Sequence, residues 1–285
     1  MSKRKNIKKK NYWNFRLRLG LVLLIFFMIL GFIAPLFCKV DPVEWQTYPR
    51  NLDPSAEHWL GTTGLGQDTF WLLSYSIRNS FMVGISVAFF ATIIGVFVGL
   101  LAGFKGGWAD RIITLLTDSF IVIPSLPILI LVSSMIKGAA PLIYIALILI
   151  IFNWPWPARQ VRSMALSLKE RDFINTALFS GESTGKIIIK EIFPFVMNWS
   201  FANFINTILV AIAAESSLAV IGMSSNTTAT LGTMIYWANE HQAMLAGRWV
   251  WIGAPVVATA LIFIALFLTM TGGQQMSAKR RGTNA

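Results

Sequence analysis

The sequence has few of the residues on which soluble proteins and most enzymes depend. Only 13% of its 285 residues are charged, whereas 55% are hydrophobic, and the mean hydropathy is +0.62. Such a composition lies outside the range of soluble globular domains and indicates an integral membrane protein. A single cysteine, Cys38, excludes an internal disulfide framework and any metal site built from several cysteines.

Histidine is almost as scarce as cysteine. His58 and His241 lie far apart in the sequence, and neither has a partner one helical turn away. We therefore expect no metal site at these positions, and we expect both side chains to serve in loop packing or in docking of another protein. The apolar segments also lack a set of His and Glu ligands or an activated nucleophile, which argues against an enzyme embedded in the membrane.

Six apolar runs are long enough to cross a hydrocarbon core of roughly 30 Å. Each must satisfy its own backbone hydrogen bonds inside lipid, so all six are predicted to be helices. The runs are 19–38, 79–103, 112–136, 140–157, 198–222 and 249–271.

The basic residues predict the orientation of these helices. Segments 1–18, 103–111, 158–192 and 279–281 hold 19 of the 24 lysines and arginines, and all four lie on the same side of the membrane if the six runs cross it. Cytoplasmic loops carry the excess of basic residues, so we expect both termini in the cytoplasm. The net charge of +11 therefore reflects topology and gives no reason to expect nucleic acid binding.

These assignments divide the chain into regions. We expect Trp59 and Trp237, on the exterior side, to anchor the protein at the lipid interface. The regions are a basic cytoplasmic tail at 1–18, a first helix and extracytoplasmic segment at 19–78, a core of five helices at 79–275 that includes a cytoplasmic loop at 163–194, and a cytoplasmic tail at 276–285.

The loop between the fourth and fifth runs contains a charged, amphipathic segment at 166–194. Ser167 and Glu170 fit a capping box, so a helix is expected over about 168–180, with Gly181 at its end. Ser183 is expected to begin a second helix that runs to Pro194, where the chain turns into the fifth span. Periodicity alone also allows an interfacial helix that lies on the lipid headgroups.

Part of this segment, 181–186, superficially resembles a phosphate-binding loop. The motif requires four residues between its first glycine and the Gly-Lys pair, followed by Ser or Thr. Here three residues intervene, and Ile187 follows Lys186. We therefore expect the chain to bind no ATP and to carry no cofactor of its own.

Small residues recur at every fourth position of the second span. Ala91, Gly95, Gly99 and Gly103 lie on one face of the predicted helix. Such a stripe lets a neighbouring backbone approach closely in the membrane. The neighbour can be another helix of this chain or a helix of a second protein subunit.

Several motifs in this order resemble one family. They are His58-Trp-Leu-Gly-Thr-Thr-Gly-Leu-Gly-Gln-Asp68, Gly99-Leu-Leu-Ala-Gly-Phe-Lys-Gly-Gly-Trp-Ala-Asp110, Asp118 with Pro124-Ser-Leu-Pro127, and Ala214-Glu-Ser-Ser-Leu-Ala-Val-Ile-Gly222. Together they resemble the permease subunits of ATP-binding-cassette importers, in particular the second, shorter permease of the dipeptide, oligopeptide and nickel branch. The resemblance extends from about residue 15 to 275.

The charged segment resembles the cytoplasmic loop of these permeases. The family signature is Glu-Ala-Ala, a glycine four residues later and a final Leu-Pro, whereas this chain has Asn175-Thr176-Ala177, Gly181 and Phe193-Pro194. The resemblance implies a coupling helix that docks on an ATPase subunit. The residues it assigns to coupling are Glu170, Asp172, Phe173, Asn175, Thr176, Ala177, Phe179, Gly181 and Pro194.

The resemblance also implies the fold and the partners. The fold would be all-α, with six transmembrane helices in the bundle of a type I importer permease and a cytoplasmic coupling helix. The partners would be a homologous permease in a heterodimer, two ATP-binding-cassette subunits that hold ATP and magnesium, an extracytoplasmic substrate-binding protein and the lipid bilayer of a prokaryotic cell membrane.

By the same resemblance, the protein would import peptides by alternating access and would not itself be an enzyme. Nickel, metal chelates and oligosaccharides remain alternative substrates, and a secondary transporter working alone is the alternative from another class. Polar residues within the spans are candidates to line the pathway, because ionisable groups inside the membrane are costly. They are Asp118, Asn203, Asn206 and Glu215, although Asp118 and Glu215 are equally candidates for structural hydrogen bonding.

Overall fold

The computed structural model describes residues 14–135, 141–224 and 227–283, and this part of the chain is helical apart from its loops. An isolated β-bridge between Thr62 and Asp68 is its one extended pairing. The helices are α1 (Phe15–Met28, continued by Ile29–Ile33 and Ala34–Phe37), α2 (Thr69–Lys105), α3 (Gly107–Val122), α4 (Ser125–Met135), α5 (Leu142–Asn153), α6 (Pro155–Lys169), α7 (Asp172–Phe179), α8 (Thr184–Ile187, continued by Ile188–Ile192), α9 (Phe193–Val220), α10 (Leu231–Glu240) and α11 (Trp249–Thr283).

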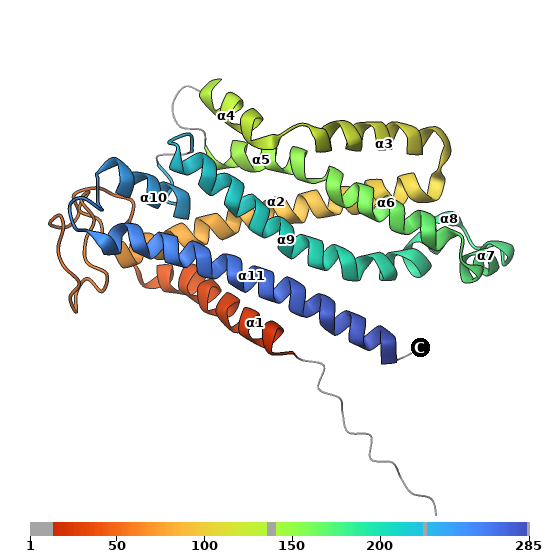
Figure 1. The fold of residues 1–285 in the computed structure, drawn as a ribbon, viewed down its shortest axis with the longest axis horizontal. Coiled ribbons are helices and arrows are strands. Elements are labelled where there is room, and N and C mark those ends of the chain that lie inside the picture. The colour runs from red at the N-terminus through yellow and green to blue at the C-terminus, as the bar shows by residue number, and fades with distance from the viewer. Residues whose placement is uncertain (1–13, 136–140, 225–226, 284–285) are drawn as a thin grey trace, which may run out of the picture.

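The long helices lie side by side in an elongated bundle (Figure 1). The short helices α7 and α8 lie at one end of it and α10 at the other, and we call these the α7 end and the α10 end. Asn14 donates a hydrogen bond of 2.9 Å to Gln275, so the start of α1 meets the last part of α11. Both helices therefore have their terminal ends at the α7 end of the bundle.

Five helical stretches are long and apolar enough to span a membrane, and the bent pair α3 and α4 raises the number to six if it forms one span. This agrees with the six spans expected from the sequence and with an all-α membrane fold. Helix α2 is longer than its apolar run because the Asp68 carboxylate accepts hydrogen bonds from the amides of Phe70 and Trp71 and caps the helix before the run begins.

The stripe of small residues on α2 packs against α6 of the same chain. A Cβ atom on Gly95 would lie 2.6 Å from Pro157, one on Gly99 would lie 2.5 Å from the Ala158 carbonyl oxygen, and one on Gly103 would lie 2.7 Å from Ala165. Ala91 is fully buried at the head of the stripe. Of the two neighbours that the sequence allowed for the stripe, the structure selects the internal helix.

The expectation of one continuous third span was wrong. The run expected at 112–136 breaks into α3 and α4, which meet at an angle of 77°. Proline has no amide hydrogen and pushes the preceding residue out of the helical region. Ile123 is accordingly extended, with φ −74° and ψ 121°, directly before Pro124.

The capping box expected at Ser167 and Glu170 was also wrong. Helix α6 continues through Lys169, so Ser167 is helical, whereas an N-cap residue must be non-helical. Burial of Leu168 in the apolar cluster below α7 keeps this turn in α6. The next helix therefore begins at Asp172, after the extended residue Arg171, and not at 168.

The second expected helix of this loop continues without a turn into the fifth span. Ser183 is extended at the N-cap position but makes no side-chain cap. A π-helical turn at Ile188–Ile192 joins α8 to α9, and Pro194 lies in the first turn of α9, where its missing amide hydrogen is tolerated. Residues 184–192 and the fifth span therefore form one helical stretch, 184–220.

Candidate coupling helix and transport site

Helix α7 projects from its end of the bundle and is fixed on one side only. Ile174 is completely buried, and the ring of Phe173 stacks on Phe195 of α9 with centroids 5.8 Å apart. On the opposite side, Phe179 is 92% exposed. An exposed aromatic side chain on a short, one-sided helix is typical of a surface that another protein covers.

The residues assigned to coupling divide into two groups in the structure. Phe173 points inward and Ala177 is half-buried. The remaining residues are each exposed at the surface. They are Glu170, Asp172, Asn175, Thr176, Phe179, Gly181 and Pro194. Pro194 begins α9 on a different helical stretch, so it is not part of the α7 surface itself.

Gly181 ends α7 in a left-handed conformation, with φ +78°. The amide of Gly181 donates to Leu178 O at 3.1 Å, and the amide of Glu182 donates to Ala177 O at 3.2 Å. A Cβ atom on Gly181 would have nothing within 4 Å, so backbone conformation, and not crowding, favours glycine there. Beyond the turn, the hydrogen bond from Lys186 lowers the pKa of Glu182.

An apolar cluster joins α7 to the long helices. Its buried members come from α2, α6, α7, α8 and α9, and include Phe104, Leu168, Ile174, Ile187 and Val196. The Lys169 ammonium group donates to Phe104 O at 2.9 Å and lies over the Phe104 ring, which ties the end of α6 to the end of α2. The inner side of α7 is therefore in packed contact with several of the long helices.

The candidate pathway residues fall in three different places. Asp118 lies half-exposed on α3, where its carboxylate is 3.4 Å from the Arg159 guanidinium group of α6. Asn203 is buried within α9 and donates to Thr207 Oγ1 at 3.4 Å, whereas Asn206 is half-buried. Of these residues, Asp118 is the one that borders an open groove.

Glu215 is completely buried at the α10 end of α9. Its Oε1 atom accepts hydrogen bonds from Thr230 Oγ1 at 2.9 Å and from Ser224 Oγ at 3.2 Å. Thr230 is also the N-cap of α10, so the carboxylate fixes the start of that helix. This geometry agrees with the hydrogen-bonding alternative considered for Glu215 from the sequence.

Sequence reasoning missed the charged residues Asp110 and Arg162, which line the groove, and Arg159, which contacts Asp118. Asp110 on α3 forms a two-bond ion pair with Arg162 on α6, and Arg159 lies one turn before Arg162. The spacing in the sequence could have indicated these residues. Asp110 and Asp118 are eight residues apart, which places them on one face of a helix, and Arg159 and Arg162 are three residues apart, which places them on one face of the next helix. Only the α3–α6 contact shows that the two sets meet.

The segment between α1 and α2 covers the α10 end. His58 Nδ1 lies 2.7 Å from Asp68 Oδ2, and its ring packs edge-on against Tyr48. This agrees with the expected role of His58 in loop packing. Among the described residues, no three His, Cys, Asp or Glu side chains are grouped as metal ligands.

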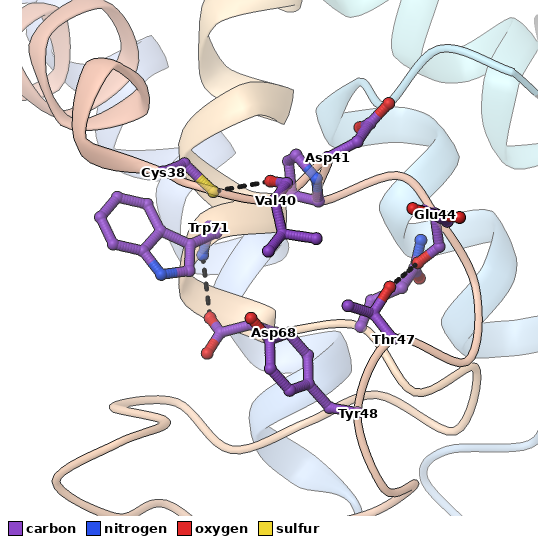
Figure 2. A pocket seen from close by; sticks show the side chains of 10 residues that line it. Cys38, Val40, Asp41, Glu44, Thr47, Tyr48, Asp68 and Trp71 are labelled. Carbon is purple, nitrogen blue, oxygen red and sulfur yellow. Dashed lines mark hydrogen bonds between the residues drawn. The ribbon is translucent and has the colours of Figure 1, made fainter.

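A small pocket lies in this segment (Figure 2), with the Asp68 carboxylate beside Trp71 and Cys38 nearby. Its volume of about 10 Å³ is no more than a single water molecule requires. It is therefore too small to serve as a substrate site.

The fold and the projecting helix define a multi-pass membrane protein of the permease class. Residues 95–283 match the model of the family described as "Binding-protein-dependent transport system inner membrane component". This match covers more than half of the chain, and the chain belongs to that family.

Similar proteins of known name are peptide permeases. The chain is 32% identical to the oligopeptide transport system permease protein OppC of Mycobacterium tuberculosis, over 77% of this chain and 74% of that protein. It is also 32% identical to the dipeptide transport system permease protein DppC of Bacillus subtilis, over 88% of this chain and 75% of that protein.

A solved structure of the MetNI methionine ABC transporter in an inward-facing conformation has a similar fold. The TM-score is 0.57 at 17% identity, and the match covers 73% of this chain and 96% of that chain. At this identity the likeness shows the fold alone, which is that of an importer permease bundle.

Proposed function

We propose that this chain is a permease subunit of an ATP-driven peptide importer and that α7 is its coupling helix. The observation that carries the proposal is the one-sided fixation of α7, with Ile174 buried beneath it and Phe179 almost fully exposed on it. A helix held this way can receive a partner on its outer side and transmit the partner's movement through its inner side.

The orientation follows from charge. The α7 end holds the basic segments, including the arginines at the start of α1 and the loop 158–192. Basic residues mark the cytoplasmic side, so α7 and both termini would face the cytoplasm and α10 the exterior. An ATPase in the cytoplasm would then meet α7, and a binding protein outside would meet the α10 end.

The partners follow from this arrangement and from the family. A second, homologous permease would complete the pathway, and two ATPase subunits would hold ATP and magnesium, so this chain itself would catalyse nothing. Closure of the ATPases on nucleotide would displace α7, and the bundle would alternate between states open to either side. Such coupling requires contacts that differ between the two states.

Peptides are the substrate class that the relatives favour, since similar proteins carry the names of oligopeptide and dipeptide permeases. The family match covers residues 95–283, from within α2 to the end of α11. Nickel, metal chelates and oligosaccharides remain secondary candidates because an extracytoplasmic binding protein would deliver the substrate.

Co-purification tests the proposal directly. The ATPase subunits should co-purify with the tagged wild-type chain, and Phe179→Asp should reduce their recovery by about tenfold, because a charge replaces an aromatic side chain at the centre of the contact. Leu245→Asp is a matched control, since Leu245 is equally exposed but follows α10 at the opposite end. Equal ATPase recovery from both variants would contradict the assignment of α7.

A further inference from the structure

A polar seam runs between α3 and α6. Asp110, Thr114 and Asp118 recur at every fourth residue of α3, and Arg159 and Arg162 lie one turn apart on α6. Side chains four residues apart lie on one face of a helix. The three polar side chains of α3 therefore lie in a row that faces the two arginines of α6. An open groove of about 700 Å³ is lined by the three polar residues of α3 and by Arg162, together with Arg111, Ser119 and Val122. Arg159 is connected to this groove through its contact with Asp118.

The two ion pairs of this seam differ in geometry. Arg162 donates through Nε and Nη2 to the two carboxylate oxygens of Asp110, and the side chains are only 26% and 20% exposed. This forked arrangement is strong and geometrically specific. Arg159 and Asp118 make a single contact of 3.4 Å, and their side chains are 54% and 49% exposed.

The looser pair is the exchangeable one. A half-exposed ion pair contributes little stability, so competing charges can replace its partners. With no ligand bound, each member neutralises the other. A molecule carrying an ammonium group and a carboxylate can separate the pair and leave no charge without a partner.

Asp118 lies within the apolar run 112–136, and Arg159 directly follows the apolar run 140–157. Asp118 follows the start of α3 by about 16 Å along the helix axis at a rise of 1.5 Å per residue. Arg159 lies beside Ala158, whose carbonyl oxygen packs on Gly99 in the apolar part of α2. Charged side chains within or next to apolar spans favour a polar cavity or a protein partner as their neighbour, because exposure to hydrocarbon is costly.

We propose that Asp118 and Arg159 form a subsite of the translocation pathway that binds the two ends of a zwitterionic peptide. The peptide ammonium group pairs with the Asp118 carboxylate, and the peptide carboxylate pairs with the Arg159 guanidinium group. This inference rests on the proposed function, because it gives the pathway of the peptide importer its charge selectivity. The Asp110–Arg162 pair holds α3 and α6 together beside the subsite and is not exchanged.

The test uses a cysteine placed in the groove. Cys38 is the one cysteine of the chain, so a Cys38→Ser, Ser119→Cys variant carries a single thiol beside the subsite. The complete importer containing this variant is reconstituted without its binding protein, and a small thiol reagent labels it in the presence of trialanine or trialanine amide. We expect trialanine to slow the labelling of this thiol. Trialanine amide lacks the free carboxylate, so it should need a concentration about tenfold higher to slow labelling to the same extent.

Substitutions at the subsite provide the second arm. In the same background, Arg159→Gln should remove the difference between trialanine and its amide, because the group that senses the carboxylate is gone. Asp118→Asn should weaken protection by both. Thr114→Val is the matched control in the seam, and it should leave the difference intact.

Other outcomes overturn the inference. If trialanine and its amide protect the thiol equally, or if neither protects it, the proposed subsite is wrong. A cysteine that reacts in the isolated chain but not in the assembled importer would show that a second permease covers the groove. Uptake of trialanine by the importer with its binding protein is measured separately, and a lack of uptake by the wild type would refute the proposed function itself.

Discussion

The two ends of the bundle are held by different kinds of interaction. At the α10 end, the start of α10 is fixed by directional bonds, since Glu215 accepts from Thr230, Asn79 donates to Ala229 O at 2.7 Å, and Ser80 accepts from the Leu231 amide at 3.1 Å. At the α7 end, α7 is fixed mainly by apolar contacts on one side. The start of α10 is therefore held by polar contacts within this chain, whereas α7 is held by apolar packing and leaves Phe179 exposed.

The difference also concerns what each end can do. Hydrogen bonds between buried polar groups are directional, so a displacement of α10 would break them at a cost in free energy. Apolar contacts depend less on direction, so a packed cluster can move as one body. Directional bonds at the α10 end and apolar packing at the α7 end are consistent with our proposal that the bundle is driven from the α7 side.

The largest effect is expected when α7 is broken. Ala177→Pro removes an amide hydrogen in the interior of α7 and places the ring against the carbonyl group one turn earlier, at a cost of about 3 kcal/mol. The helix has only eight residues, so we expect insertion into the membrane to persist while peptide uptake falls almost to background. Uptake and membrane content are measured on the same vesicles.

Thr184→Pro is the control for this prediction. Thr184 is the first residue of α8, a position that tolerates proline, and Ser183 before it is already extended. It should retain most of the uptake. Normal uptake by Ala177→Pro would mean that α7 does not transmit movement. The different packing of the two ends of the bundle would then have no role in transport.

A smaller effect is expected from substitutions at the α10 end, which should lower the stability of the protein. Glu215→Ala leaves two buried hydroxyl groups without their acceptor and opens a cavity, which should lower the free energy of unfolding by about 2–4 kcal/mol. Glu215→Gln keeps an acceptor and the volume, so it should lose less than half as much. Thermal denaturation of the purified protein in detergent measures both.

Ser217→Ala is the control on the same helix, since Ser217 is exposed and bonds only within α9, to Ala213 O. Its denaturation temperature should match that of the wild type. If Glu215→Ala were as stable as Ser217→Ala, the network would not hold α10, and the α10 end would be no more rigid than the other.

The smallest effect is expected between the ends, where α2 meets α6. In Gly99→Ala the new methyl group would lie 2.5 Å from the Ala158 carbonyl oxygen, so the helices must separate slightly, at a cost of about 1–3 kcal/mol. Gly253→Ala in α11 is the control, because nothing lies within 4 Å of the added atom. Equal denaturation temperatures for the two variants would show that α2 and α6 are not closely packed, and that movement of α6 need not reach α2.

Much of the fold was predictable because the membrane restricts it. Apolar runs of sufficient length must be helices in lipid, and the six spans followed from that rule. The stripe at Gly95, Gly99 and Gly103 predicted close helix packing but not the neighbour. Distance along the chain does not tell which helices meet, and only the contact with Pro157, Ala158 and Ala165 identified α6.

The predictions that failed were local ones. Ser167 and Glu170 have the spacing of a capping box, but burial of Leu168 keeps that turn within α6, and tertiary packing outweighs a cap worth about 1 kcal/mol. Pro124 was visible in the sequence, yet its effect on an otherwise apolar run was underestimated. The candidate site was predicted as a helix and a set of residues, and not as a surface with an inner and an outer side.

The sequence by itself determined that this is a membrane protein built from long apolar helices and that a charged segment interrupts them at 166–194. It also predicted six spans, with the basic segments on one side. These are properties of composition and periodicity along one chain. Only the tertiary structure decided that Phe173 faces inward and Phe179 outward, that Glu215 fixes α10, and that Asp118 meets Arg159. Each of these depends on which helices pack together, because a contact between distant segments is specified by the whole fold and by no single stretch of it.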